Sequence, residues 1–244
     1  RLLQAPAGLG ANAAESMLPY VDPYNFLFAG GMCIAAAMQQ CSLHRRIALN
    51  IMRVIGTDPR RLLLGFLSAT AFISLWISNT ATATMMVPIG FAMIAQLENQ
   101  LGGRRLEHYG AAIMLSIAYA ANLGGIGTKI GTAPNAQFSC FMQGLGIDIS
   151  FLQFMVVGMP FVVMFLPVAW LMLWRIGRAD KLPGDFGATV VEDEVRKLGP
   201  IKKVEVVGLG VFLVTAMLWI AGKLLTGFLQ SQVTGLKITT AHVE

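Results

Sequence analysis

Three consecutive polar residues, at positions 78–80, interrupt an apolar run that extends from 62 to 97. The tripeptide Ser-Asn-Thr disfavours a helix interior and favours a helix N-cap, because its short side-chain oxygens accept from free backbone N–H groups. We therefore expect two helical arms, 62–77 and 80–97, that meet at a polar tip. The free carbonyls that end the first arm suit a small cation, and the free N–H groups that begin the second suit a carboxylate.

Several neutral oxygen groups gather around this tip. Ser74 and Ser78 are four residues apart, so their hydroxyls share one helix face, and the amide of Asn79 follows directly. Because hard cations prefer oxygen and a single positive charge needs no carboxylate, these groups predict a sodium site. Asn79 and Thr80 can also donate, which predicts that they hold a substrate carboxylate. The alternative for Ser74 is packing, with its hydroxyl bonded to its own turn or to a neighbouring helix.

A second break, at 122–135, contains four glycines and a proline within an otherwise apolar region. It offers backbone carbonyls at 124–127, the hydroxyls of Thr128 and Thr132, and the amide of Asn135 beside Pro134. The glycines are also typical of close helix packing. Lys129 lies within the break, where a charge at membrane depth is costly. We expect its side chain to reach water through the loop; the alternative is that it neutralises an anionic substrate.

The composition predicts a membrane protein. Hydrophobic residues make up 55% of the chain and charged residues 13%, against about 25% charged in an ordinary soluble domain. The basic residues cluster at the ends of apolar segments, as in cytoplasmic loops, which argues against a nucleic-acid partner. The three cysteines and three histidines lack the spacing of a disulfide framework or a metal site. No nucleophile–base pair, carboxylate pair in an apolar segment or phosphate-binding Gly-Lys-Ser/Thr motif is present, so we expect no enzyme.

These sites require helices that end inside the bilayer. The two arms are about 16 and about 18 residues long, roughly 25 Å each, which is marginal for a full span. Basic pairs at 60–61 and 104–105 flank the arms, and this favours a re-entrant hairpin over two ordinary spans. The other expected elements are a membrane helix at 24–40, an interfacial helix at 47–55, a helix start with Asp58 as N-cap, two halves of one broken helix at 109–121 and 136–145, a span at 151–174 capped by Asp148 and Ser150, a solvated linker at 175–203, and a last span at 204–225.

Four segments together resemble the divalent anion/sodium symporter family of sodium-coupled dicarboxylate, citrate and sulfate transporters. They are SNTATATMMVPI at 78–89, GGIGTKIGTAPN at 124–135, LHRRIAL at 43–49 and DPRRLLLGF at 58–66. The resemblance implies an all-α, polytopic helical bundle, the first unit of an inverted repeat in which each half contributes a re-entrant hairpin and a discontinuous helix. It also implies a homodimer and an elevator movement of a transport part against a fixed scaffold.

The resemblance assigns residues by position. Ser74, Ser78, Asn79 and Gly127 match a sodium site, and Asn79 and Thr80 match the tip that contacts substrate. The segment that contains Thr132, Pro134 and Asn135 matches the turn beside that tip. The implied division is an N-terminal scaffold at 1–59, a transport part at 60–148 with its hairpin at 60–100 and broken helix at 108–146, a membrane helix at 149–174, a cytoplasmic linker at 175–203, and a membrane helix with the start of a second repeat at 204–244.

The chain departs from the family pattern in carrying one Ser-Asn-Thr tip where the family has two. Residues 235–244 resemble the opening of the second repeat, so we expect about half of a transporter, which alone neither binds dicarboxylate tightly nor transports it. The expected activity is sodium-coupled transport of di- or tricarboxylate anions across a lipid bilayer, most simply the plasma membrane. The alternatives are an anion exchanger, a proton-coupled carrier and a channel. Lys129 stands where the family often has an uncharged residue.

Overall fold

The computed structural model describes residues 23–180, 182 and 187–235. Within them the chain is helical and contains no strand, which confirms the prediction of an all-α protein. The helices, in chain order, are α2 (Pro23–Gln40), α3 (Leu43–Ile55), α4 (Pro59–Ser74), α5 (Asn79–Gln100), α6 (Glu107–Ile126), α7 (Ala133–Gly144), α8 (Phe151–Gly177), the short 3-10 helix η2 (Arg178–Asp180), α9 (Ala188–Leu198) and α10 (Lys203–Gly235). The expectations for 1–22 and 236–244 lie outside the described residues.

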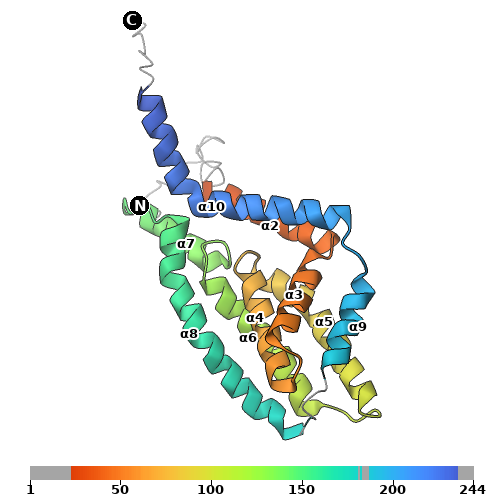
Figure 1. Ribbon diagram of the computed structural model, residues 1–244. Helices are drawn as coiled ribbons and strands as arrows, with labels where there is room; N and C mark the ends of the chain where they lie inside the picture. Colours follow the sequence, from red (N-terminus) through yellow and green to blue (C-terminus); the bar gives the residue numbers. More distant parts are fainter. Residues whose placement is uncertain (1–22, 181, 183–186, 236–244) are drawn as a thin grey trace, which may run out of the picture.

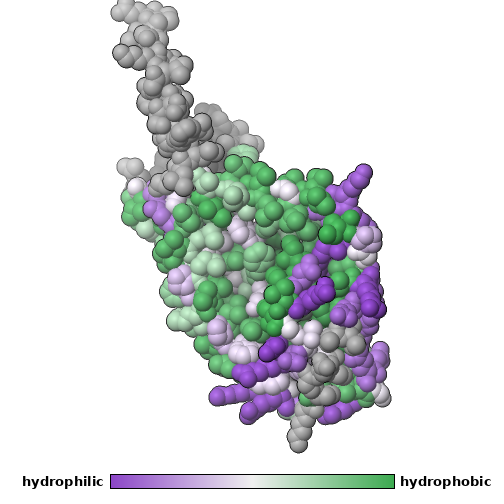
Figure 2. Space-filling model, viewed as in Figure 1, coloured by the Kyte–Doolittle hydropathy of each residue, from purple (hydrophilic) through white to green (hydrophobic). Residues whose placement is uncertain are grey.

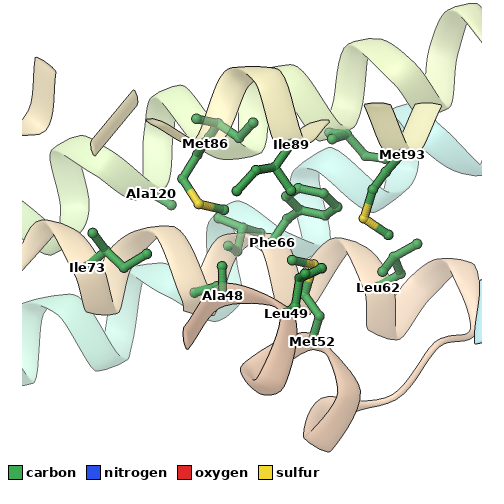
Figure 3. Close-up of a cluster of buried hydrophobic side chains, with 14 of the residues drawn as sticks. Ala48, Leu49, Met52, Leu62, Phe66, Ile73, Met86, Ile89, Met93 and Ala120 are labelled. Atoms are coloured by element: carbon green, nitrogen blue, oxygen red, sulfur yellow. The ribbon is translucent and has the colours of Figure 1, made fainter. Parts of the chain in front are cut away.

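Helices α4, α6 and α8 run side by side and form the body of the molecule, with α3 and α5 packed against α4 and α6 (Figure 1). Helices α2 and α10 contact each other and lie across the end of this body where the hairpin tip is found (Figure 1). Apolar side chains from α3, α4, α5 and α6, among them Phe66, Met86 and Met93, fill the space between these helices (Figure 3). This core fixes the hairpin against the broken helix, so the two breaks come together.

The described part of the chain contains four stretches that are long and apolar enough to cross a membrane: α5, α6, α8 with η2, and Lys203–Gly222 of α10. In the last two, most of the apolar surface is not covered by protein. Figure 2 shows apolar residues over the face formed by these helices, with hydrophilic residues gathered towards one end and one side. Apolar side chains that are not covered by protein are stable only in contact with lipid. The chain is therefore a multi-pass membrane protein.

The first hairpin arm has the expected length but different ends, and the second arm is longer than expected. Helix α4 has 16 residues and ends at Ser74, three residues early, whereas α5 has 22 residues and continues to Gln100. Length therefore no longer argues against a full crossing by α5, and re-entry of the hairpin remains a prediction. The N-cap position of α4 is occupied by Asp58 as expected, but its side chain makes no cap hydrogen bond and pairs with Arg61 at 3.6 Å.

The first half of the broken helix was predicted too short. Helix α6 runs through Gly124 and Gly125 to Ile126 and has 20 residues. These glycines do not break the helix; they allow it to touch α4, because a Cβ atom on Gly124 would lie 2.2 Å from the carbonyl oxygen of Ala71. The break is confined to 127–132, before α7 begins at Ala133.

The prediction that the charges of 175–203 form a solvated face holds only in part, because the described residues of this segment include a helix that packs against the body of the protein. Helix α8 continues to Gly177, and α9 is an amphipathic helix that buries Val190, Val191 and the carboxylate of Glu194. Glu194 forms ion pairs with Arg45 of α3 and with Lys197, the latter at 2.6 Å. Burial tends to raise the pKa of Glu194, but the hydrogen bonds and charges of these two partners outweigh it and lower the pKa.

Of two other helix starts, one differs from the expected position and one agrees with it. Helix α3 begins at Leu43, four residues earlier than predicted. The N-cap of α8 is Ser150, whose hydroxyl accepts from the backbone N–H of Gln153 at 3.1 Å while the Gln153 side chain accepts from the Ser150 N–H at 2.8 Å. The predicted start of α8 at 151 and the predicted cap Ser150 are thus confirmed, and Gln153 completes a reciprocal capping box with Ser150.

Candidate functional site

The polar tip lies between the end of α4 and the start of α5, as predicted. Helix α5 begins at Asn79, and Ser78 is its N-cap, with its hydroxyl accepting from the backbone N–H of Ala81 at 3.4 Å. The turn at 75–78 packs against the break that follows α6. The Oγ1 of the fully buried Thr128 donates to the carbonyl oxygen of Leu75 and accepts from the backbone N–H of Gly131 at 3.1 Å. One threonine therefore joins the two breaks.

Four oxygen atoms converge where the breaks meet. In one orientation of the Asn79 carboxamide, its Oδ1 lies 3.0 Å from Ser74 Oγ, 2.9 Å from the carbonyl oxygen of Ala121 and 3.1 Å from that of Gly131. Ser74 is fully buried, and its hydroxyl lies 2.6 Å from the same Ala121 oxygen. In this orientation the hydroxyl supplies the one proton among these four atoms, so the remaining oxygen–oxygen contacts are repulsive unless a positive charge lies between them. A small hard cation meets this requirement. In the other orientation the amide nitrogen faces the same three oxygens and donates to them.

The missing side chains of glycines make this convergence possible. A Cβ on Gly125 would lie 2.1 Å from Asn79 Oδ1, and a Cβ on Gly131 would lie 2.5 Å from the Gly125 carbonyl oxygen and 2.9 Å from that of Ser74. Real Cβ atoms essentially never come within 3.0 Å of such neighbours. The glycines thus serve both alternatives raised by the sequence, close packing and presentation of backbone carbonyls to a ligand.

Asn135 stabilises the second break. Its Nδ2 donates to the carbonyl oxygens of Gly125 at 2.8 Å and Thr128 at 2.7 Å. These bonds tie the end of α6 and the loop to the first turn of α7. Thr132 occupies the N-cap position of α7 without a side-chain cap bond, and Pro134 follows on an exposed turn.

A cavity of about 510 Å³ opens between α5 and α6 next to the tip. Its polar lining comes from Asn79, Thr80, Thr84 and Asn122. Thr80 is exposed here, at the start of α5 where free N–H groups and the helix dipole favour an anion. Thr132, Pro134 and Asn135 do not line this cavity, so within the described residues the predicted substrate positions fall into two separate groups.

Two predicted sodium positions lie beside the oxygen cluster without a hydrogen bond to it in the described part of the chain. Ser78 is exposed and lines a second cavity of about 260 Å³ between the tip and α2. Gly127 donates its N–H to the Gly124 carbonyl at 2.9 Å, and a Cβ on Gly127 would meet Leu75 and Met159. The structure brings Ser74 and Asn79 together directly, and it adds the carbonyls of Ala121 and Gly131 to the candidate site.

Lys129 does not reach water, so the expectation for it is wrong. Its residue surface is 5% exposed, and its ammonium donates to the carbonyl oxygen of Ile149, which immediately precedes the N-cap of α8. The loop folds against α8, where Gly158 packs closely on the carbonyls of Ile126 and Gly127. The lysine side chain therefore links the break after α6 to the segment that begins α8.

Asn122 was missed as a site residue in the sequence, where it marked only the edge of a glycine-rich segment. Its Oδ1 accepts from Asn79 Nδ2 at 3.0 Å, and its Nδ2 donates to the carbonyl oxygen of Ala118 at 3.2 Å. The available signal was an amide at the first position of the break, but the partner lies 43 residues away.

Comparisons with known proteins identify the family of this chain. A family model described as the sodium:sulfate symporter transmembrane region matches residues 7–242. A protein of Staphylococcus saprophyticus named sodium-dependent dicarboxylate transporter is 36% identical over 232 residues, which are 92% of this chain and 44% of the relative. A protein of the same name from Staphylococcus aureus is 38% identical over 214 residues, 84% of this chain and 41% of the relative. The chain thus spans less than half the length of these relatives, which are transporters and not enzymes.

Proposed function

Because the chain belongs to the sodium:sulfate symporter family, we propose that it forms the N-terminal half of a sodium-coupled carrier for di- or tricarboxylate anions in the plasma membrane. Its relatives are named as sodium-dependent dicarboxylate transporters. The observation that carries the proposal is the oxygen cluster of Ser74, Asn79, Ala121 and Gly131, which contains no acidic group and offers four oxygen ligands to a cation when the Asn79 oxygen faces inward.

In this proposal sodium binds at Ser74 and Asn79, with Ser78 and Gly127 completing the site from its two sides. Neutral oxygen ligands leave the bound ion with its full positive charge. That charge lies directly beside the cavity at Thr80, where it attracts an anion together with the N-terminal dipole of α5. Sodium binding therefore comes first and makes the anion site favourable.

The carboxylate of the substrate binds at Asn79 and Thr80, and the turn with Thr132, Pro134 and Asn135 supports the site from the other side. The cavity beside Thr80 is open, and in the proposed inverted repeat the second half closes it with a tip of its own. The present chain then supplies one of two half-sites, and tight binding requires both.

The proposed movement is of elevator type, with the hairpin re-entrant and the complete protein a homodimer. Close contacts at Gly124, Gly125 and Gly131 bind the hairpin and the broken helix into one unit. A unit packed at this density moves as a body, since such interiors are not continuously deformable. Helices α2 and α10, which lie across its end, are candidates for the fixed scaffold (Figure 1).

The test is uptake of labelled succinate into proteoliposomes that contain the full-length protein. We expect saturable uptake that requires an inward sodium gradient and stops when potassium replaces sodium. Ser74→Ala and Asn79→Ala should each raise the sodium concentration for half-maximal uptake, whereas Ser68→Ala, on the same helix but outside the cluster, should not. Uptake that is driven equally by a proton gradient without sodium would favour a proton-coupled carrier, and unsaturable flux would favour a channel.

Substrate choice is tested in the same vesicles. Competition by citrate and by sulfate, each against labelled succinate, ranks the anions. We expect dicarboxylates to compete best, and exclusive competition by sulfate would refute the carboxylate assignment.

A further inference from the structure

The Asn79 carboxamide fits its surroundings in two orientations. In the first, Oδ1 faces the oxygen cluster and Nδ2 donates to Asn122 Oδ1 at 3.0 Å. In the second, after a half-turn about the last side-chain bond, the nitrogen faces the cluster. It then lies 3.0 Å from Ser74 Oγ, 2.9 Å from the Ala121 carbonyl oxygen and 3.1 Å from the Gly131 carbonyl oxygen.

The two orientations suit different states of the cation site. With the nitrogen turned inward, amide N–H groups supply the positive charge that the oxygen cluster requires, and no ion is needed. With the oxygen turned inward, Asn79 adds a ligand for a cation but opposes two carbonyl oxygens when the site is empty. The empty site thus favours the nitrogen inward, and the occupied site favours the oxygen inward.

Asn122 cannot remain still while Asn79 turns. When the Asn79 oxygen faces outward, it lies 3.0 Å from Asn122 Oδ1, and two acceptors at this distance repel. Asn122 must then rotate its own carboxamide so that its nitrogen donates to Asn79. The two amides therefore change orientation together, as a pair.

We propose that Asn122 is a positioning residue that couples the sodium site to the anion site, an inference that rests on the proposed function. Asn122 is exposed and lines the same cavity as Thr80. With sodium bound, Asn122 Oδ1 is held by Asn79, and its Nδ2 donates one N–H to the Ala118 carbonyl at 3.2 Å and keeps a second N–H on the side away from Asn79. With the site empty, the nitrogen turns towards Asn79, the bond to Ala118 is lost, and an oxygen takes the place of the nitrogen on that side. A carboxylate that enters the cavity then meets an amide donor when sodium is bound and an acceptor when it is not.

The experiment measures the thermal stability of the purified full-length protein against sodium concentration, with potassium keeping the ionic strength constant. The same titration is repeated with succinate to obtain the ratio of succinate affinities at high and low sodium. Asn122→Ala removes the hydrogen bond that holds Asn79 with its oxygen inward. We expect its half-stabilising sodium concentration to rise about five-fold, which corresponds to one neutral hydrogen bond. The sodium-dependent gain in succinate affinity should fall by a similar factor.

Asn122→Asp provides the opposite change. A carboxylate only accepts, so it holds Asn79 with the nitrogen outward and the oxygen inward, and the half-stabilising sodium concentration should fall. Thr84→Asp is the matched control, because it places the same charge in the same cavity on a residue that does not contact Asn79. We expect Asn122→Asp to lower the sodium requirement at least three-fold more than Thr84→Asp does.

The outcomes separate this inference from the proposed function. If sodium stabilises the unmodified protein no better than potassium, the proposed sodium site is refuted and the inference falls with it. If the unmodified protein responds to sodium, but Asn122→Ala keeps the same half-point and the same succinate affinity ratio, the inference alone is refuted. Equal effects of Asn122→Asp and Thr84→Asp would also refute it, because charge and not amide orientation would explain the change.

Discussion

The Gly125→Ala substitution tests directly whether the oxygen cluster is the sodium site. A methyl group on Gly125 would lie 2.1 Å from Asn79 Oδ1 and 2.9 Å from its Cγ. The obstacle is the end of a side chain, so we expect the Asn79 carboxamide to swing away while the helices stay in place. It then loses its hydrogen bonds to Ser74 and Asn122. At about 1 kcal/mol for each bond, sodium binding weakens by about 2 kcal/mol, or about 30-fold.

The assay is sodium-dependent thermal stabilisation of the full-length protein in detergent, with potassium as the balancing cation. The matched control is Gly110→Ala, a buried glycine on the same helix whose Cβ would meet Ile94 at an ordinary 3.5 Å. We expect Gly110→Ala to keep the sodium half-point within about two-fold, because one added methyl in ordinary contact changes packing little.

The reasoning fails if Gly125→Ala binds sodium as tightly as the unmodified protein. That result would mean that Asn79 is not a ligand, or that the helices separate enough to accept the methyl group. The second possibility is checked by the melting temperature without sodium, which should fall for a general separation of α4 and α6 and should change little for a local displacement of Asn79.

Three further substitutions give distinct results. Gly124→Ala places its Cβ 2.2 Å from the backbone oxygen of Ala71, which cannot move aside, so we expect about 1–3 kcal/mol of destabilisation in sodium and potassium alike; a wild-type melting temperature would contradict this. The pKa of Glu194 is lowered below its ordinary 4.5, so its contribution to stability is complete above that pH and is lost as the pH falls through the lowered pKa. The melting temperature of Glu194→Gln should therefore approach that of the unmodified protein on acidification from about pH 6 to about pH 3, and a constant difference would refute the ion-pair assignment. Lys129→Met leaves a partly buried carbonyl without its donor and should cost about 1–3 kcal/mol without changing the sodium half-point, whereas a large change in that half-point would assign the lysine to the ion site.

Local sequence signals were sufficient to predict the class of protein and the regions that contain the two breaks. Apolar content and segment length predict a multi-pass helical membrane protein, and a Ser-Asn-Thr tripeptide predicts a helix start whose N-cap is indeed Ser78. These features depend on residues close together in the chain. The helix ends were less accurate, because the last turn of a helix is stabilised by whatever it packs against. Helix α6 continues through Gly124 and Gly125 since α4 supports it there.

The errors concern pairs of residues that are far apart in sequence. Glu194 was expected in solvent because its partner Arg45, which pairs with it across the fold, lies 149 positions away. Lys129 was expected to reach water because a charge at membrane depth is costly, but its ammonium donates to the carbonyl of Ile149, 20 residues further along the chain. Asn122 had no role until the fold placed it against Asn79. In each case a polar group was classified by its neighbours in the chain, whereas the fold supplied a partner from a distant segment.

The proposed cation site depends more on the short distance between α4 and α6 than on the Ser-Asn-Thr tripeptide at 78–80. The hairpin supplies Ser74 and Asn79, and the broken helix supplies two carbonyls that any sequence would possess. What is specific is the closeness of α4 and α6, which depends on glycine where a Cβ would meet backbone or the Asn79 amide. Substitution of Gly125, whose Cβ would meet the Asn79 amide, should therefore impair sodium binding as severely as substitution of the oxygen-bearing side chains. A sequence that kept Ser-Asn-Thr but replaced the glycines would keep the helix cap and lose the site.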